Sequence, residues 1–275
     1  MKLKVKKTNF DPKQTFCCGQ CFRWRELENG AFLAIVSGKP ITVIEDCGKI
    51  EIESDHTRNF LENYFDLQTD YGEYIKRFSS DPTLKAACEN ASGIRILRQE
   101  PFETLLSFII SQNNNIPRIC GIIDRLCESF GEQVDGGYAF PSAERLRGVT
   151  AEDLAPLRAG FRAKYLVDAV SRVNSGETDF AEIDALPLDK ARERLKRIKG
   201  VGDKVADCVL LFAFHKLDAF PKDVWVKRLM SEFYPEGLPK CTEGAEGVAQ
   251  QYLFDYVRNN GGLKTTDSEK STVKS

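Results

Sequence analysis

The chain has 275 residues, 42% of them hydrophobic and 29% charged, the composition of an ordinary globular protein with one large domain or two smaller ones. Its 39 Lys and Arg residues against 41 Asp and Glu residues give a net charge of −2, which taken alone argues against a protein that binds polyanions without specificity. No apolar run approaches the ~18 residues of a membrane span, and the basic N-terminus lacks the apolar segment of a signal peptide. We therefore expect a cytoplasmic protein with no membrane partner.

The nine cysteines are an odd number in a chain long enough to fold without disulfides, so free thiols are expected. Cys17, Cys18 and Cys21 form the densest group. A zinc site would need a second cysteine pair or a histidine at ligand spacing, and neither His56 nor His215 stands at such a distance. The cysteine pattern therefore does not favour a zinc site.

Short runs rich in β-branched residues near the N-terminus predict an antiparallel meander, because turn residues separate them. The runs cover residues 32–36, 41–44 and 50–53. Two helices, at residues 57–65 and 70–79, are expected to cover one face of this sheet.

The strand pattern disappears after Pro101, which suits the first turn of a helix. Residues 102–111 are almost all apolar and predict a buried helix, and residues 116–130 show apolar side chains at helical spacing. Further helices are predicted at 142–147, 151–158, 163–174, 189–198, 204–214, 224–233 and 245–259. The fold class is therefore α+β, with an antiparallel β domain over 1–100, a helical domain over 101–263 and a disordered polar tail over 264–275.

Residues 195–206, LKRIKGVGDKVA, carry two glycines between two predicted helices. Gly200 and Gly202 permit positive φ angles and a close approach of the backbone, and the turn ends at a helix N-terminus, where free N–H groups favour phosphate. The segment resembles the helix–hairpin–helix motif of DNA-binding proteins. The alternative is a plain pair of helices joined by a glycine turn.

Asp223 follows Lys204 by 19 residues, and this combination resembles the helix–hairpin–helix glycosylase superfamily. In that superfamily the aspartate is catalytic, and a lysine at this position marks the members that also cleave the strand. Lys204 stands in the first turn of its helix, where the dipole favours the neutral amine that attacks C1′ of the sugar. The Schiff base so formed permits strand cleavage by β-elimination, while Asp223 stabilises positive charge on the sugar. The alternatives are a solvated lysine and a simple helix N-cap.

The segment 19–25, GQCFRWR, resembles one branch of the superfamily, the 8-oxoguanine DNA glycosylase/AP lyases, with cysteine in place of a serine. The resemblance implies that the backbone carbonyl of Gly19 accepts the additional N7–H of the oxidised guanine. It also implies a sandwich of the flipped base between Cys208 and Phe254, with Gln250 bonding its Watson–Crick edge. Without the resemblance, a turn glycine and ordinary core residues are the alternatives.

The run 111–116, SQNNNI, resembles the Asn-rich loop of the same branch, which implies that Asn113 fills the space left by the flipped base. Arg118 and Arg162 resemble the two arginines that read the orphaned cytosine, since a guanidinium fork suits its acceptors. Phe161 stands where the branch usually has a wedging tyrosine, so stacking is kept but the hydroxyl is lost.

The chemistry that the resemblance implies uses side chains and requires no cofactor. A structural cation is implied at the hairpin, held by the backbone carbonyls of Lys196, Ile198 and Val201. Trp225 departs from the human-type proteins of the branch, which have a histidine there, so a phosphate or proton role of that histidine does not transfer.

These features together predict a base-excision repair enzyme, a bifunctional DNA glycosylase/AP lyase that removes 8-oxoguanine, preferably opposite cytosine. The expected partner is double-stranded DNA containing 8-oxoguanine, bound by a monomer in the cytoplasm of a bacterium or archaeon. A glycosylase for another base and a non-catalytic DNA-binding protein are the alternatives. An iron–sulfur glycosylase would need a C-terminal cysteine cluster, but only Cys241 follows Cys208, and a monofunctional enzyme would not need Lys204.

The overall charge conceals a basic segment. Residues 190–228 hold eleven Lys and Arg residues and five Asp and Glu residues, a net charge of +6, so the other 236 residues carry −8. We therefore expect DNA binding on one face of an acidic body, with a salt dependence set by few phosphate contacts.

Overall fold

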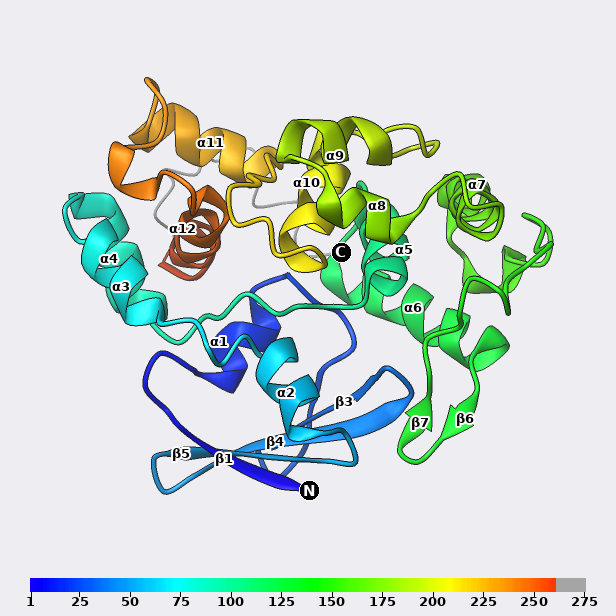
Figure 1. Cartoon of the computed structure of the whole chain (residues 1–275), viewed down its shortest axis with the longest axis horizontal. Helices are drawn as coiled ribbons and strands as arrows, with labels where there is room; N and C mark the ends of the chain where they lie inside the picture. Colours follow the sequence, from blue (N-terminus) through cyan, green and yellow to red (C-terminus); the bar gives the residue numbers. More distant parts are fainter. Residues whose placement is uncertain (261–275) are drawn as a thin grey trace.

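The computed structural model describes residues 1–260 as an antiparallel sheet at one end of a larger helical body (Figure 1). The sheet has five strands in the order β1-β5-β4-β3-β2, and all neighbours are antiparallel. The strands are β1 (Lys2–Lys6), β2 (Arg25–Glu26), β3 (Phe32–Val36), β4 (Lys39–Asp46) and β5 (Lys49–Ser54). The predicted meander is confirmed in β3, β4 and β5.

Strand β1 lies outside the predicted strands, because three of its five residues are lysine. It pairs with β5, where Leu3 lies opposite Ile52 and packs into the core under the sheet. Lys2 and Lys4 each place Nζ 2.9 Å from a carboxylate oxygen of Glu51. Pairing with β5, rather than local β propensity, therefore makes this edge strand.

The sheet packs on α1 (Pro12–Cys17) and α2 (Arg58–Tyr64), which lie between it and the helical body (Figure 1). Phe16 of α1 stacks on Trp24 with ring centroids 3.9 Å apart and meets Phe32 of β3 edge-on. Asp11 caps α1 by accepting a hydrogen bond of 2.9 Å from the backbone N–H of Gln14. These contacts anchor the segment that contains Gly19.

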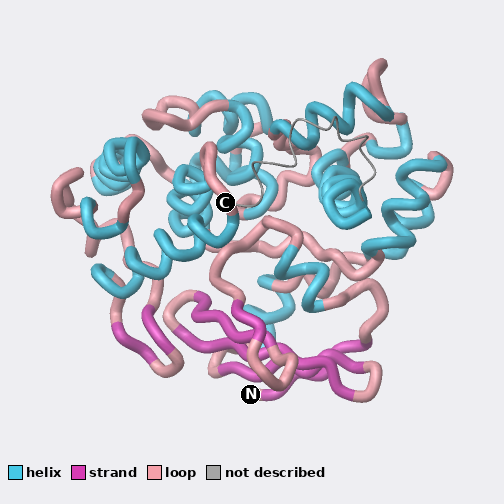
Figure 2. The backbone as a smooth tube through the Cα atoms, turned by 180° about the vertical axis from the view of Figure 1, so that it is seen from behind, coloured by secondary structure: helices cyan, strands magenta, loops and turns pink. Residues whose placement is uncertain are grey.

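Figure 2 shows the remaining helices above the strands, seen from behind. They are α3 (Tyr71–Phe78), α4 (Pro82–Ala91), α5 (Pro101–Ser111), α6 (Ile116–Phe130), α7 (Ala163–Asn174), α8 (Phe180–Ala185), α9 (Leu188–Leu195), α10 (Asp203–Phe212), α11 (Val224–Phe233) and α12 (Glu246–Asn260). Helix α10 packs on both α5 and α9, and α12 packs along α4. The predicted α+β fold class is confirmed.

Two predicted helices are wrong. Residues 143–148 form turns that end at a glycine with φ +78°, and residues 151–158 contain only the 3-10 turn Ala155–Leu157, closed by Arg158 at φ +57°. In both segments most backbone hydrogen bonds run from an N–H group to the carbonyl three residues back rather than four, so turns form instead of an α-helix. The structure adds the helices α1, α4 and α8 and the hairpin of β6 (Gln133–Val134) and β7 (Gly137–Tyr138).

Helices α3 and α4 contribute to the core of the helical body, where Phe78 of α3 meets Tyr252 of α12 edge-on. The division of the chain at residue 100 stays a prediction. The predicted tail, residues 264–275, lies outside the described residues.

Candidate active site

The glycine hairpin between α9 and α10 leaves the first turn of α10 open. Gly200 has φ +81°, and a Cβ there would lie 2.4 Å from the ring of Tyr165, so only glycine fits. Gly202 is the N-cap of α10 and makes no side-chain cap hydrogen bond, and a Cβ there would meet nothing within 4 Å. No side chain at the N-cap position therefore bonds the first N–H groups of α10, and these groups can donate to a phosphate oxygen.

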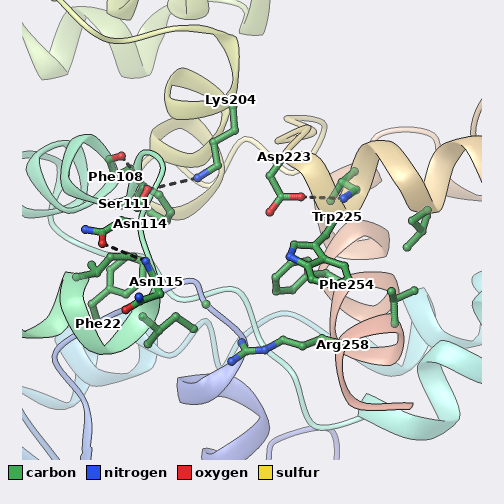
Figure 3. A pocket seen from close by; sticks show the side chains of 16 residues that line it. Phe22, Phe108, Ser111, Asn114, Asn115, Lys204, Asp223, Trp225, Phe254 and Arg258 are labelled. Carbon is green, nitrogen blue, oxygen red and sulfur yellow. Dashed lines mark hydrogen bonds between the residues drawn. The ribbon is translucent and has the colours of Figure 1, made fainter. Parts of the chain in front are cut away.

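Lys204 is the second residue of α10, and its side chain points toward α5 (Figure 3). Its Nζ lies 3.4 Å from Ser111 Oγ and 5.1 Å from the ring centre of Phe108. No carboxylate within residues 1–260 lies at ion-pair distance from this amine. The amine is therefore held by a hydroxyl and an aromatic face, without a counter-ion that would block it as a nucleophile.

Asp223 begins α11 as its N-cap, and Oδ1 accepts a hydrogen bond of 2.7 Å from the backbone N–H of Val226. This bond fixes the carboxylate, and its other oxygen faces the pocket across from Lys204 (Figure 3). One carboxylate therefore caps a helix and also presents a negative charge to the pocket.

Lys204 and Asp223 share a pocket of about 400 Å³ with a mostly apolar wall. Phe22 and Phe108 lie on one side of it, and Trp225 and Phe254 lie on the side of Asp223 (Figure 3). Further polar groups come from Ser111, Asn114, Asn115 and Arg258. An apolar pocket with a few convergent polar groups is typical of a ligand site.

A smaller cavity of about 50 Å³ shares walls with this pocket and gathers the residues predicted to recognise the base. They are Gly19, Cys208, Gln250 and Phe254, together with Lys204 and Asp223. Gly19 has φ +86°, and a Cβ there would lie 3.7 Å from the ring of Phe254. Burial raises the pKa of the Cys208 thiol to about 11, against a smaller opposing effect of Lys204, so the thiol is neutral at pH 7.

A buried arginine shapes the Asn-rich loop between α5 and α6. Arg162 is 2% exposed, and its guanidinium makes four hydrogen bonds to the backbone carbonyls of Gln112, Asn113 and Ala159. Asn113 itself is exposed and has φ +46°, which asparagine tolerates better than most residues. A guanidinium has five N–H donors, so one N–H group of Arg162 remains for another partner.

Arg118 and Phe161 lie at the surface beside this loop. Arg118 is exposed, and its charge together with burial lowers the pKa of Arg162, with burial as the larger effect. Phe161 is 49% exposed, with the guanidinium of Arg162 4.4 Å from its ring centre. The structure therefore places the three residues assigned to the opposite strand, Arg118, Phe161 and Arg162, together beside Asn113.

The predicted cation ligands lie in the hairpin itself. The carbonyl of Ile198 accepts a hydrogen bond of 3.0 Å from the N–H of Val201, which leaves a second lone pair for a cation. The side chain of Lys196 pairs with Glu193 and Asp203, at 2.8 and 2.9 Å. Backbone carbonyls are hard oxygen ligands that fit such an ion, and the cation stays a prediction.

Two family models match adjoining segments of the chain. The N-terminal domain of 8-oxoguanine DNA glycosylase matches residues 2–105, and the HhH-GPD superfamily of base excision DNA repair proteins matches residues 106–240. A probable N-glycosylase/DNA lyase of Methanothermobacter thermautotrophicus is 31% identical over 95% of this chain and 97% of that protein. The chain belongs to the 8-oxoguanine DNA glycosylase family.

The glycosylase is also similar to solved structures along nearly its whole length. The 8-oxoguanine glycosylase/lyase of Clostridium acetobutylicum, in complex with double-stranded DNA containing cytosine opposite 8-oxoG, is 40% identical with a TM-score of 0.86, over 95% of this chain and 98% of that chain. The apo-form of that protein is 41% identical with a TM-score of 0.87, over 93% and 96% of the two chains. The predicted family, enzyme class and role in base-excision DNA repair are confirmed.

No helix within residues 1–260 of the glycosylase is both long enough and apolar enough to cross a membrane.

Several lining residues of the glycosylase are absent from the predicted site. Phe108 and Ser111 lie on α5, where eight of eleven residues are buried, so the sequence does not mark the face that meets the pocket. Arg258 lies one helical turn after Phe254, and this spacing is a signal that would have found it. Gln251, which also lines the smaller cavity, carried no signal in the sequence, because a glutamine on a helix is usually solvated.

Proposed function

We propose that the glycosylase excises 8-oxoguanine from duplex DNA, with Lys204 as the nucleophile, and then cleaves the strand. The observation that carries the proposal is the pair of Lys204 and Asp223 across one apolar pocket, beside the cavity lined by Gly19. A DNA-binding scaffold would use the hairpin but neither side chain. A monofunctional glycosylase would use the aspartate but not the lysine.

The reaction begins when the neutral amine of Lys204 attacks C1′ of the flipped nucleotide. The C1′–N9 bond breaks, and the purine leaves with that electron pair and takes up a proton. Loss of the amine proton and opening of the sugar ring then give a Schiff base between Nζ and C1′. Removal of a proton from C2′ expels the 3′ phosphate by β-elimination, which cuts the strand.

Asp223 supports this sequence electrostatically. Positive charge develops on the sugar as the base departs, and the second carboxylate oxygen of Asp223 faces the pocket that we assign to this sugar (Figure 3). The hydrogen bond from Val226 holds the carboxylate in advance, so it needs little reorganisation during the reaction. Ser111 Oγ, 3.4 Å from Nζ, orients the amine.

We assign recognition of the base to the residues of the smaller cavity. The neutral thiol of Cys208 and the ring of Phe254 supply the two faces between which a purine stacks, and Gln250 bonds its Watson–Crick edge. The Gly19 carbonyl accepts N7–H of 8-oxoguanine and repels the N7 acceptor of guanine. This cavity shares Gly19 and Phe254 with the larger pocket of about 400 Å³ that holds Lys204 and Asp223.

We assign the DNA backbone to Gly200 and Gly202, and the opposite strand to the surface around the Asn-rich loop. That surface consists of Arg118, Phe161 and Arg162, and Asn113 beside it fills the space left by the flipped base. The structural cation at Lys196, Ile198 and Val201, the monomeric state and the cytoplasmic location belong to the same proposal. Lys204 supplies the nucleophile and Asp223 the stabilising charge, so the proposed reaction requires no cofactor.

The test of the function is cleavage of a labelled duplex with a single 8-oxoguanine opposite cytosine. We expect the β-elimination product without added alkali, no cleavage of the matching guanine duplex, and slower cleavage with adenine opposite. Substitution of Cys208 or Phe254 by alanine should reduce the preference for 8-oxoguanine over guanine. Release of the free base from an intact strand would contradict the lyase step, and cleavage only at another damaged base would contradict the substrate.

A further inference from the structure

Helix α12 carries two adjacent glutamines into the smaller cavity. Gln250 and Gln251 are 5% and 4% exposed, and both line the cavity beside Cys208 and Phe254. Nε2 of Gln251 donates a hydrogen bond of 2.9 Å to Oε1 of Gln250. Glutamine is rarely buried to this extent, so two neighbouring buried amides at a candidate base site require a reason.

The amide of Gln251 is only half satisfied. Its Oε1 is buried and has no hydrogen-bond partner within residues 1–260. An unpaired buried amide oxygen costs about 1–3 kcal/mol, a cost that an apolar side chain of similar length would avoid. A ligand that enters the cavity with an N–H group would supply the missing partner.

The two amides share one hydrogen bond, so together they keep one NH₂ group and one carbonyl oxygen for other partners. Exchanging oxygen and nitrogen in both side chains leaves this sum unchanged. The Watson–Crick edge of a guanine-type base presents the acceptor O6 beside N–H donors, which is the complementary pattern. The pair therefore matches that edge better than either glutamine alone.

We propose that Gln251 is a second base-recognition residue of the glycosylase. Its Oε1 accepts a hydrogen bond from the Watson–Crick edge of the flipped purine, and its Nε2 holds the Gln250 amide so that the Gln250 NH₂ group donates to O6. The inference rests on the proposed function. It assigns Gln251 to base excision and not to strand cleavage, because an abasic site presents no base to bond.

The test compares two reactions of Gln251→Met, in which the side chain keeps its length but loses the amide. We expect excision of 8-oxoguanine in single turnovers to slow by about tenfold or more, since about two hydrogen bonds to the base edge are lost or misplaced. Cleavage of a duplex with a pre-formed abasic site should stay within about twofold of wild type. If Gln251→Met does not fold, Gln251→Glu replaces it. The glutamate keeps the shape of the side chain but cannot donate to Gln250, so we again expect slower excision and unchanged cleavage of the abasic site.

Gln14→Met is the matched control, because the Gln14 amide bonds the backbone of Asn90 and Gly93 and does not line the cavity. It should leave the ratio of the two rates unchanged. Equal loss of both rates in the Gln251 variant, or excision at the wild-type rate, would overturn the inference. A wild-type protein inactive on both substrates would overturn the proposed function instead.

Discussion

The carboxylate of Asp223 has one oxygen committed to the fold and one turned to the pocket. The first role is that of any helix N-cap, and asparagine performs it nearly as well. The second role needs negative charge, which asparagine lacks. The two roles are therefore separable by substitution.

Asp223→Asn should keep the stability of the protein while base excision falls by a factor of about 100 or more. Asp223→Ala should lose excision and, because the cap is gone, also lower the free energy of unfolding by about 1 kcal/mol. Single-turnover excision and urea denaturation measure the two effects. An Asn variant with wild-type excision would show that Asp223 only caps α11.

Site residues that belong to a recognisable sequence motif were predicted. Site residues that reach the pocket only because distant elements pack together were not. The resemblance of Lys204 and Asp223 to the helix–hairpin–helix glycosylase superfamily implied that the pair would share a site, and the structure places both in one pocket. Gln251 was missed because a glutamine on a helix is usually solvated, and only the packing of α12 turns it inward. Arg162 was predicted from its resemblance to a DNA-reading residue, but its backbone bonds across the Asn-rich loop come from tertiary structure.

At the scale of elements, the hairpin between α9 and α10 contains two glycines with different roles. Gly200 is required by the conformation and packing of the turn, and Gly202 leaves the N-terminus of α10 accessible. Gly200 combines a positive φ with contact to the ring of Tyr165, while Gly202 has free space around its Cα. The two positions are two residues apart and differ in backbone conformation as well as in surroundings, because Gly202 has φ −101°. They form a matched pair for substitution.

Gly200→Ala should lower the free energy of unfolding by about 2 kcal/mol or more and weaken DNA binding, because the methyl group would overlap Tyr165 in a strained conformation. Gly202→Ala should change stability by less than about 1 kcal/mol. Thermal unfolding of the two variants checks the difference. Equal stability of both would mean that the hairpin shifts freely to accept the side chain.

Helices and strands that form because of their own residues were predicted, and those that depend on contacts with distant segments were not. Strands β3, β4 and β5 follow from their own β-branched residues, whereas β1 depends on its pairing with β5. The helices predicted at 142–147 and 151–158 are wrong because most backbone hydrogen bonds there run from an N–H group to the carbonyl three residues back and form turns. Such turns depend on packing and are not evident from apolar spacing.

At the scale of the whole molecule, Asp66 joins the sheet region to the helical body. Its buried carboxylate lies 2.9 Å from the guanidinium of Arg98, 3.2 Å from the ring of His215 and 2.9 Å from the hydroxyl of Tyr71. Burial alone would raise the pKa of Asp66, but His215 and Arg98 outweigh it and lower the pKa. The folded protein therefore holds this carboxylate in its charged form.

A lowered pKa in the folded state stabilises the protein fully above the unfolded pKa of about 3.9, and the stabilisation is lost as the pH falls through the lower folded value. Asp66→Asn should therefore lower the free energy of unfolding by about 2–4 kcal/mol at pH 7. The difference from wild type should shrink below about pH 4. Urea denaturation at pH 7 and pH 3 measures it, and a difference independent of pH would contradict the role of the charge.

The basic segment 190–228 has fewer unpaired cations than its composition suggests. Ion pairs join Arg192 to Asp207, Arg194 to Glu182, Lys196 to Asp203 and Lys199 to Asp168. These pairs leave fewer cations for phosphates. We therefore expect this face to bind DNA through few phosphate contacts and with a correspondingly small salt dependence.

The central claim is that Lys204 forms a covalent bond to the sugar, and trapping of the Schiff base with borohydride tests it most directly. Wild-type protein on a duplex with 8-oxoguanine opposite cytosine should give a stable protein–DNA complex. Lys204→Gln should give none while still binding the duplex, and Lys199→Gln, an exposed lysine of the same hairpin, should trap like wild type. A covalent complex formed by Lys204→Gln at the wild-type yield would contradict the account.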